Sequence, residues 1–359
     1  MIARPGRSAA QQAYRFPVLD HLQAMTDDVG ILQHATLDIP NRSCGYCTDD
    51  VGRALIVACE AAARTPADRD AARLVMTYLA YLHDAQLLDG WFHNFMGYDR
   101  RWQDQGGSQD AVGRAIWGLG VAERIAPRDT WRLTASVMRR RALRTIERME
   151  HLRPRAYAAL GFVQALAARP DDELVLRRAL DDSVRTIADA YDAYRAPDWE
   201  WCEDVMTYDN ARLPEALLRA GAALDEPRYV ATGLAMLRFY TSVVIDDGMF
   251  APVGSAGWYP RGGTKARFGQ QPLEAAAFVD AALVAHDVTG DRTWRSAAEI
   301  AHDWYLGANV HGIVLAASGG CRDGLDEGGV NPNQGAESTL CYLMSAMALA
   351  KASSTLRAV

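Results

Sequence analysis

The sequence predicts an all-α protein, an (α/α)6 barrel with long loops and short β-hairpins at the end that holds the active site. Six times, a cluster of Asp, Glu, Asn, Gln and Arg runs directly into an apolar helix rich in small residues. The starts of these segments lie roughly 45 to 65 residues apart, a spacing typical of repeated helical units. Helices with one charged face lie between them, and strand patterns are few.

The six helices that follow polar clusters are expected to be buried. Beyond the first turn they carry mostly Ala, Gly and Leu, and a helix that is apolar nearly all round must be covered by other elements. If all six run in one direction, their polar starts gather at one end of the barrel as a single site. These starts contain, in chain order, Asp49 and Asp50, Asp110, Arg153, Asp209, Glu274, and Glu337.

The helices between them are expected on the outside, because apolar residues recur at i, i+3, i+4 and i+7 beside a charged face. An open solenoid of helix pairs is the alternative, but irregular repeats and long aromatic loops favour the closed barrel. Met249–Val253 and Ile313–Leu315 are strand-like and short enough to pair locally. The outer helices are predicted at 17–34, 69–87, 130–150, 172–194, 227–244 and 291–306.

Residues 17–352 are expected to form one catalytic domain after a flexible N-terminal arm, residues 1–16, because no linker or low-complexity stretch divides the 359 residues. The net charge of −7 argues against nucleic acid or an anionic membrane as a partner. No apolar run approaches a membrane span, and no apolar core follows the arginines of Met1–Ala13. A cytoplasmic location is therefore expected.

No metal or cofactor is predicted. The six cysteines include a single C-x-x-C pair, Cys44 and Cys47, without a second ligand pair at zinc spacing. His93 is a lone histidine in an aromatic loop, where a hydrogen bond suits it better than a metal. Reduced, structural cysteines are the expectation.

Long loops precede the inner helices and hold five of the nine tryptophans, at positions 91, 102, 199, 201 and 258. Loops of this length in a compact domain are usually functional. Aromatic rings beside carboxylates suit sugars, because C–H groups stack on the ring while hydroxyls reach Asp, Asn and Arg. Each ring alone could instead pack its loop against the barrel, but the set favours a carbohydrate cleft.

Glycoside hydrolysis normally requires two acids beside the scissile bond, one protonated and one ionised. Glu203 and Asp204 lie beside Trp201, where apolar neighbours would raise a carboxyl pKa, so one of them is predicted as the general acid. Asp50 and Glu337 are weaker candidates for the base.

Other charged residues near the helix starts have two interpretations. Asp49, Asp110 and Asp209 either cap helices, which lowers a carboxyl pKa, or accept sugar hydroxyls. Glu274 either points to the barrel mouth or belongs to a capping box. Three inner helices carry an early arginine, and these are expected to bridge neighbouring carboxylates; they are Arg53, Arg114 and Arg212.

The loop Arg261–Arg267 places three cations around two glycines, which could cradle a phosphate or a carboxylate. It lacks the spacing of a P-loop, and a solvated basic loop is the alternative. The predicted substrate contacts are Asp49, Trp91, His93, Asp99, Asp110, Trp201, Tyr208, Asp209, Arg212, Trp258, Arg261, Lys265, Arg267, Gln271, Glu274, Asn333 and Gln334.

Four motifs together resemble a bacterial family of six-hairpin glycosidase-like proteins, whose members often occur beside, or fused to, glycosyltransferases. The motifs are Gly45–Asp50, Trp201–Pro214, Trp258–Gly263 and Asn333–Ser338. The resemblance implies an (α/α)6 toroid, an oligosaccharide or glycoside substrate, and a glycosyltransferase as a partner. It does not choose the reaction, because this barrel serves hydrolases, phosphorylases and epimerases alike.

The reaction predicted first is inverting hydrolysis of an oligosaccharide by two carboxylates. The alternatives are a phosphorylase using Arg261, Lys265 and Arg267, a sugar epimerase, and a non-catalytic glycan-binding partner of a glycosyltransferase. An epimerase would call for paired histidines near the cleft, and His93 is the main one there.

Overall fold

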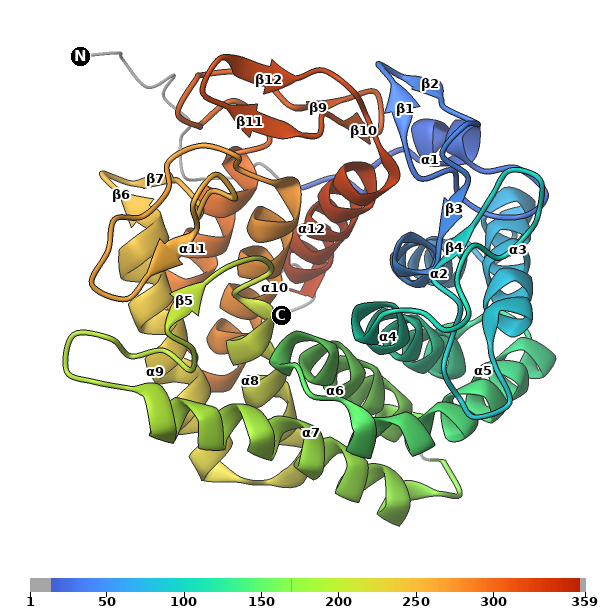
Figure 1. The fold of residues 1–359 in the computed structure, drawn as a ribbon, viewed down its shortest axis with the longest axis horizontal. Helices are drawn as coiled ribbons and strands as arrows, with labels where there is room; N and C mark the ends of the chain where they lie inside the picture. The colour runs from blue at the N-terminus through green and yellow to red at the C-terminus, as the bar shows by residue number, and fades with distance from the viewer. Residues whose placement is uncertain (1–13, 169, 356–359) are drawn as a thin grey trace.

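A ring of six inner helices forms the centre of the computed structural model, which describes residues 14–168 and 170–355 (Figure 1). Each inner helix contacts the next, and the last contacts the first, so the ring is closed. The predicted barrel is confirmed, and an open solenoid is excluded. The inner helices are α2 (Thr48–Arg64), α4 (Gln109–Ile125), α6 (Leu152–Ala167), α8 (Arg212–Leu224), α10 (Pro272–Thr289) and α12 (Ala336–Thr355).

Outer helices alternate with the inner ones along the chain and pack around them (Figure 1). Their exposed faces carry the charged residues that the sequence pattern placed outside. They are α1 (Asp20–Met25), α3 (Arg69–Ala85), α5 (Asp129–Ala142) with the following 3-10 turn η1 (Leu143–Arg148), α7 (Glu173–Tyr194), α9 (Pro227–Val244) and α11 (Arg292–Asp303).

The helix predicted over 17–34 is the main departure, because only Asp20–Met25 is helical. The Asp27 carboxylate accepts hydrogen bonds from the backbone N–H groups of Val29 and Gly30, which stabilise a turn instead of another helical turn. The predicted arm at 1–16 falls mostly outside the described residues.

Short antiparallel strand pairs connect the loops at one end of the barrel. Met249–Phe250 pairs as predicted, whereas the hairpin expected near 313–315 begins at Ala316. The pairs are β1 (Ala35–Thr36) with β2 (Ile39–Pro40), β3 (Tyr46–Cys47) with β4 (Phe95–Met96), β5 (Val205–Met206) with β8 (Tyr259–Pro260), β6 (Ile245–Asp246) with β7 (Met249–Phe250), β9 (Ala316–Ala317) with β10 (Gly320–Cys321), and β11 (Gly324–Asp326) with β12 (Gly329–Asn331).

The inner helices α2, α4 and α6 pack with their backbones in close contact. A Cβ atom added at Gly120 of α4 would meet the backbone of Gly161 in α6, and one at Gly161 would meet the backbone of Ile116 and Trp117. Glycine is used where two backbones approach closely, because any larger residue would hold them apart. Nearer the helix starts, a Cβ atom at Gly52 of α2 would meet the backbone of Arg114 in α4, and one at Gly113 of α4 would meet the backbone of Pro154 in α6, so the first turns of the three helices lie together.

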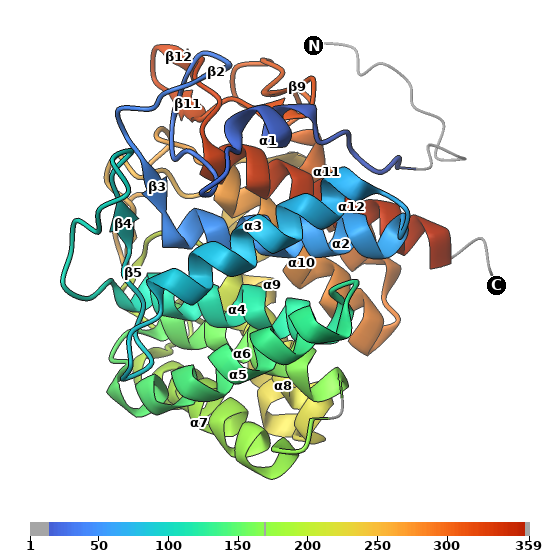
Figure 2. The same cartoon turned by 90° about the vertical axis from the view of Figure 1, so that its right-hand side faces the viewer.

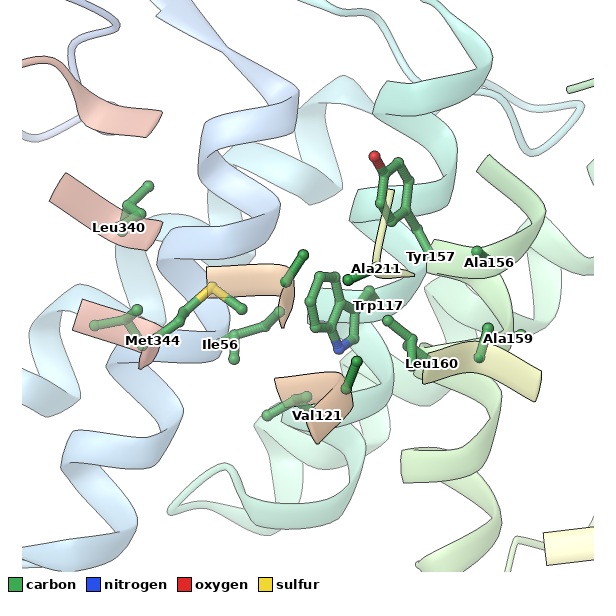
Figure 3. Close-up of a cluster of buried hydrophobic side chains, with 14 of the residues drawn as sticks. Ile56, Trp117, Val121, Ala156, Tyr157, Ala159, Leu160, Ala211, Leu340 and Met344 are labelled. Atoms are coloured by element: carbon green, nitrogen blue, oxygen red, sulfur yellow. The ribbon is translucent and has the colours of Figure 1, made fainter. Parts of the chain in front are cut away.

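Near the middle of their lengths, the inner helices direct side chains into the centre of the ring, where they meet in a layer that we call the waist (Figure 3). Trp117 of α4 lies among Ile56, Leu160 and Met344, which come from three other inner helices. The guanidinium of Arg212 lies 4.7 Å from the Trp117 ring centroid. The waist therefore separates the two ends of the ring.

In the described part of the chain, no helix is both long and apolar enough to cross a membrane.

Candidate active site

The first turns of all six inner helices meet at the end of the ring where β3, β4 and β5 lie, opposite the C-terminal end of α12 (Figure 2). We call this end the mouth. Arg114 of α4 lies 3.0 Å from Asp49, 3.3 Å from Asp209 and 3.5 Å from its own helix neighbour Asp110. One guanidinium thus joins the starts of α2, α4 and α8, so the predicted convergence of the polar helix starts is observed.

A second guanidinium, Arg53, joins α2 to α12. Its two terminal nitrogens lie 3.2 Å from Asp50 and 2.8 Å from Glu337. The Asp50 side chain is 6% exposed and the Glu337 side chain 41% exposed. Burial raises the pKa of Asp50 to about 7, opposed by Arg53 and reinforced by Glu337 and Asp49. Arg53 therefore holds one carboxyl that titrates near neutrality beside another that solvent reaches.

The open side of the mouth carries Asp49, Asp110 and Tyr208. The Tyr208 hydroxyl donates a 2.8 Å hydrogen bond to Asp110. Burial raises the pKa of Asp110 above its ordinary value, while Arg114 works in the opposite direction. All three side chains keep some solvent contact, so a ligand in the mouth can reach them.

The capping interpretation of Asp49, Asp110 and Asp209 is wrong. Ser108 caps α4 by accepting the N–H of Ala111, and no side chain caps α2 or α8. The three carboxylates bind Arg114 instead, because a buried guanidinium requires carboxylate partners.

Asp209 lies deeper in the mouth than the other two carboxylates. It accepts a 2.7 Å hydrogen bond from the Tyr157 hydroxyl. Burial alone would raise the pKa of Asp209, but Arg212, Arg114 and Arg53 hold it below its ordinary value.

Comparison with solved structures places this architecture among known folds. The chain is similar to a sugar epimerase from a ruminal bacterium, with TM-score 0.71 and 12% identity over 94% of this chain and 97% of that one. A cellobiose 2-epimerase from Bacillus thermoamylovorans gives 0.72 and 11% over 93% and 95%. A GH76 α-mannanase from Bacteroides thetaiotaomicron gives 0.61 and 12% over 94% and 95%.

The chain is a six-hairpin (α/α)6 toroid. No protein-family model matches it, and no curated protein matches it significantly. At these identities the likeness concerns the toroid fold alone.

Glu274 lies deeper inside the ring than the residues on the open side of the mouth. Its carboxylate accepts hydrogen bonds from the backbone N–H groups of Asp209 and Asn210 and a 2.7 Å bond from the Tyr240 hydroxyl. Burial raises the pKa of Glu274 to about 7, with a further increase from Asp209. The predicted sugar contact therefore positions the start of α8, because both of its oxygens already accept hydrogen bonds from Asp209, Asn210 and Tyr240.

Glu274→Gln is expected to lower the free energy of unfolding by about 1–3 kcal/mol, because its amide NH2 would face groups that donate hydrogen bonds. Urea denaturation of both proteins would measure the change. Gln271→Ala is the matched control, since Gln271 is half-buried at the N-cap of the same helix and makes no side-chain capping bond. Equal stability of Glu274→Gln and the parent protein would contradict the positioning role.

The environment expected for a general acid at Glu203 or Asp204 is not found. Trp201 is completely buried against Tyr240, so no ligand reaches its ring. Arg153 of α6 lies 3.0 Å from the Glu203 carboxylate. The Asp204 side chain is 63% exposed and lies 3.6 Å from Arg261. Cationic partners and solvent surround these carboxyls instead of apolar walls, because the loop turns Trp201 inward.

The basic loop of the toroid does not present three cations to a common ligand. Lys265 donates hydrogen bonds of 2.6 and 2.9 Å to the carbonyls of Val243 and Ala251, and burial lowers its pKa. Arg261 donates to the carbonyl of Tyr194. The Arg267 guanidinium lies 5.5 Å from the Phe268 ring. The expected phosphate cradle is therefore not assembled.

The remaining predicted contacts lie on the loops around the mouth. His93 is 3.0 Å from Asp104 and stacks on Trp102, so it is held by a hydrogen bond as expected. Asn333 accepts the N–H of Leu37, and the Gln334 carbonyl is 2.9 Å from His21. Trp91, Trp258 and Gln271 are half-buried, and Asp99 is exposed beside Arg101.

The sequence analysis placed Arg153 at a polar helix start but gave it no role, and it missed Tyr157; α6 contributes both residues to the mouth. Arg153 binds Glu203, Asn210 and the carbonyl of Tyr208, and Tyr157 binds Arg114 and Asp209. The signal was present, since α6 alone among the inner helices starts with arginines and no acid. The bridging predicted for Arg53, Arg114 and Arg212 is observed.

Proposed function

We propose that this protein is a glycoside hydrolase that binds an oligosaccharide in the mouth. Asp50 is the general acid and Glu337 is the base that activates water. The proposal rests on one observation: Arg53 holds two carboxyls in unlike environments, one buried with a pKa near 7 and one open to solvent. Pairs of acids whose pKa values are driven apart are the usual basis of glycoside hydrolysis.

Each group has a defined task in this reaction. Asp50 donates its proton to the glycosidic oxygen as the bond breaks, and the leaving sugar departs with a new hydroxyl. Glu337 accepts a proton from a water molecule that attacks the opposite face of the sugar, which inverts the anomeric carbon. Arg53 remains paired with both carboxyls as their charges exchange.

Substrate recognition is assigned to the open side of the mouth. The Asp49 and Asp110 carboxylates accept hydrogen bonds from sugar hydroxyls, and the Tyr208 ring offers an apolar surface beside them. Arg114 holds both carboxylates in place, so their positions do not depend on the ligand.

Epimerisation is the second candidate, because solved structures described as epimerases share the fold over nearly the whole chain. Asp50 could carry the proton that such a reaction moves. Among the described residues, no histidine makes a hydrogen bond to Asp50 or Glu337, and His93 is held by Asp104 instead. Histidine is the usual group for proton transfer near neutrality. Phosphorolysis lacks an assembled anion site, as the contacts of Lys265 indicate.

A screen of linked disaccharides and oligosaccharides, with and without phosphate, tests the proposal. Release of reducing sugar without phosphate is expected, and Glu337→Gln should lower it by about 10²-fold or more. Glu203→Gln is the matched control and should retain most activity. Sugar phosphate formed only with phosphate, or an altered sugar without bond cleavage, would replace hydrolysis with phosphorolysis or epimerisation. Calorimetric binding of a glycan without turnover would instead favour a non-catalytic glycan-binding protein.

A further inference from the structure

The toroid contains a second hollow, at the end opposite the mouth. This rear cavity has a volume of about 490 Å³ and is lined by residues from all six inner helices. On α2 it uses Ile56 and Glu60, which follow the mouth residue Arg53, and on α12 it uses Met344 and Lys351, which follow Glu337. The volume lies within the range of small-molecule sites, about 300–1,000 Å³.

The waist closes the rear cavity from the mouth. Arg212 lies 3.6 Å from Asp209 on the mouth side and binds Glu215 at 2.6 Å and Asp280 at 2.7 Å, both of which line the rear cavity. Trp117 fills the adjacent space (Figure 3). The rear cavity is therefore a separate site, not an extension of the proposed active site.

The surface that lines the rear cavity is more apolar than polar, although charged and polar residues make up about half of the lining residues. Inner helices that only had to pack together would fill this volume with larger side chains, because protein interiors are close-packed. The wall residues that Figure 3 labels around Trp117 are Ile56, Val121, Leu160 and Met344. This lining fits the apolar body of a small molecule.

Arg219 offers a ligand hydrogen-bond donors in the lining of the rear cavity. The carboxylates of Glu60, Glu215 and Asp280 are already paired with Lys351 or arginines. Arg219 uses only Nε, on Glu215, so its two terminal nitrogens have no hydrogen bond to a described residue. The acceptors that remain in the lining include the Asp287 carboxylate, which is exposed to solvent, and Nε2 of His286, whose Nδ1 lies 3.0 Å from the Asp291 carbonyl. A ligand that supplies an acceptor can pair with the terminal nitrogens of Arg219, and a guanidinium favours a carboxylate.

We propose that the rear cavity binds a small hydrophobic carboxylate, with its apolar body against Ile56, Val121 and Met344 and its carboxylate on Arg219. This site is independent of the proposed hydrolysis, because no residue of the mouth takes part in it.

Isothermal titration calorimetry with sodium octanoate, and with 1-octanol as the neutral analogue, tests the proposal. Ala348→Trp, which fills the cavity, should weaken octanoate binding by about tenfold or more. Arg219→Met keeps the aliphatic stem and should weaken octanoate binding about fivefold while leaving octanol binding unchanged. Glu337→Gln in the mouth is the control and should change neither.

Three results would overturn the proposal. They are no octanoate binding at millimolar concentration, octanoate binding that Glu337→Gln removes, and octanoate binding that neither rear-cavity variant weakens. If Ala348→Trp fails to fold, Arg219→Met still tests the proposal, because it should weaken octanoate binding and leave octanol binding unchanged. If Arg219→Met weakened the binding of octanoate and octanol equally, the pairing of a ligand carboxylate with Arg219 would be contradicted.

Discussion

Asp50→Asn is expected to lower kcat for glycoside hydrolysis by about 10²–10⁴-fold, because the amide cannot donate a proton to the leaving oxygen. The fold should tolerate the change. Burial raises the pKa of Asp50 to about 7, so the folded protein accommodates an uncharged group at this position near neutrality. Arg53 keeps Glu337 as its ion-pair partner. Steady-state kinetics with circular dichroism would separate lost catalysis from lost structure.

The same assignment fixes the pH dependence. A general acid must be protonated, so kcat/KM of the parent protein should fall as pH rises through about 7. Asp49→Asn is the matched control, because Asp49 precedes Asp50 on α2 but only accepts hydroxyls in this proposal. It should raise KM and keep the fall, moved to a somewhat lower pH because the Asp49 charge helps to raise the pKa of Asp50. Wild-type rates in Asp50→Asn, or a flat profile between pH 6 and 8, would remove Asp50 from its role.

Gly161→Ala should have the largest effect on stability, lowering the free energy of unfolding by about 3 kcal/mol. The new Cβ would lie under 3.0 Å from the backbone of Ile116 and Trp117 in α4. Backbone atoms cannot move aside as a flexible side chain would, so α4 and α6 must separate. Urea denaturation followed by circular dichroism would measure the change.

Gly106→Ala is the control for that experiment. Gly106 lies in an exposed loop, and a Cβ atom there would meet nothing within 4 Å. Its stability should stay within about 0.5 kcal/mol of the parent protein. If Gly161→Ala unfolded at the same urea concentration as Gly106→Ala, the close backbone contact between α4 and α6 would be disproved.

The sequence predicted the toroid well because helical periodicity is local information. The predicted outer helix 227–244 coincides with α9, and polar clusters preceded every inner helix. The failure at 17–34 has an equally local cause, since Asp27 forms a turn that the apolar spacing cannot reveal. Helix propensity does not decide the local structure where a side chain can form an alternative hydrogen bond with the backbone.

The site was predicted at the level of which helix ends meet, but not at the level of which groups face each other. Asp110 suited a cap by position, yet Ser108 performs that task and Asp110 faces Arg114. Trp201 suited a sugar platform by composition, yet its ring is buried. The rotation of each helix and the path of each loop decide such contacts, and both depend on neighbours that are distant in sequence.

The strand pairs β3–β4 and β5–β8 each join loops that belong to consecutive hairpins of the toroid. The segment before α2 is fastened to the segment before α4, and the segment before α8 to that before α10. Neither partner can swing outward without breaking main-chain hydrogen bonds to the other. The loops around the mouth therefore move in pairs, and widening the mouth for a branched ligand requires matched changes in the two hairpins that each strand pair joins.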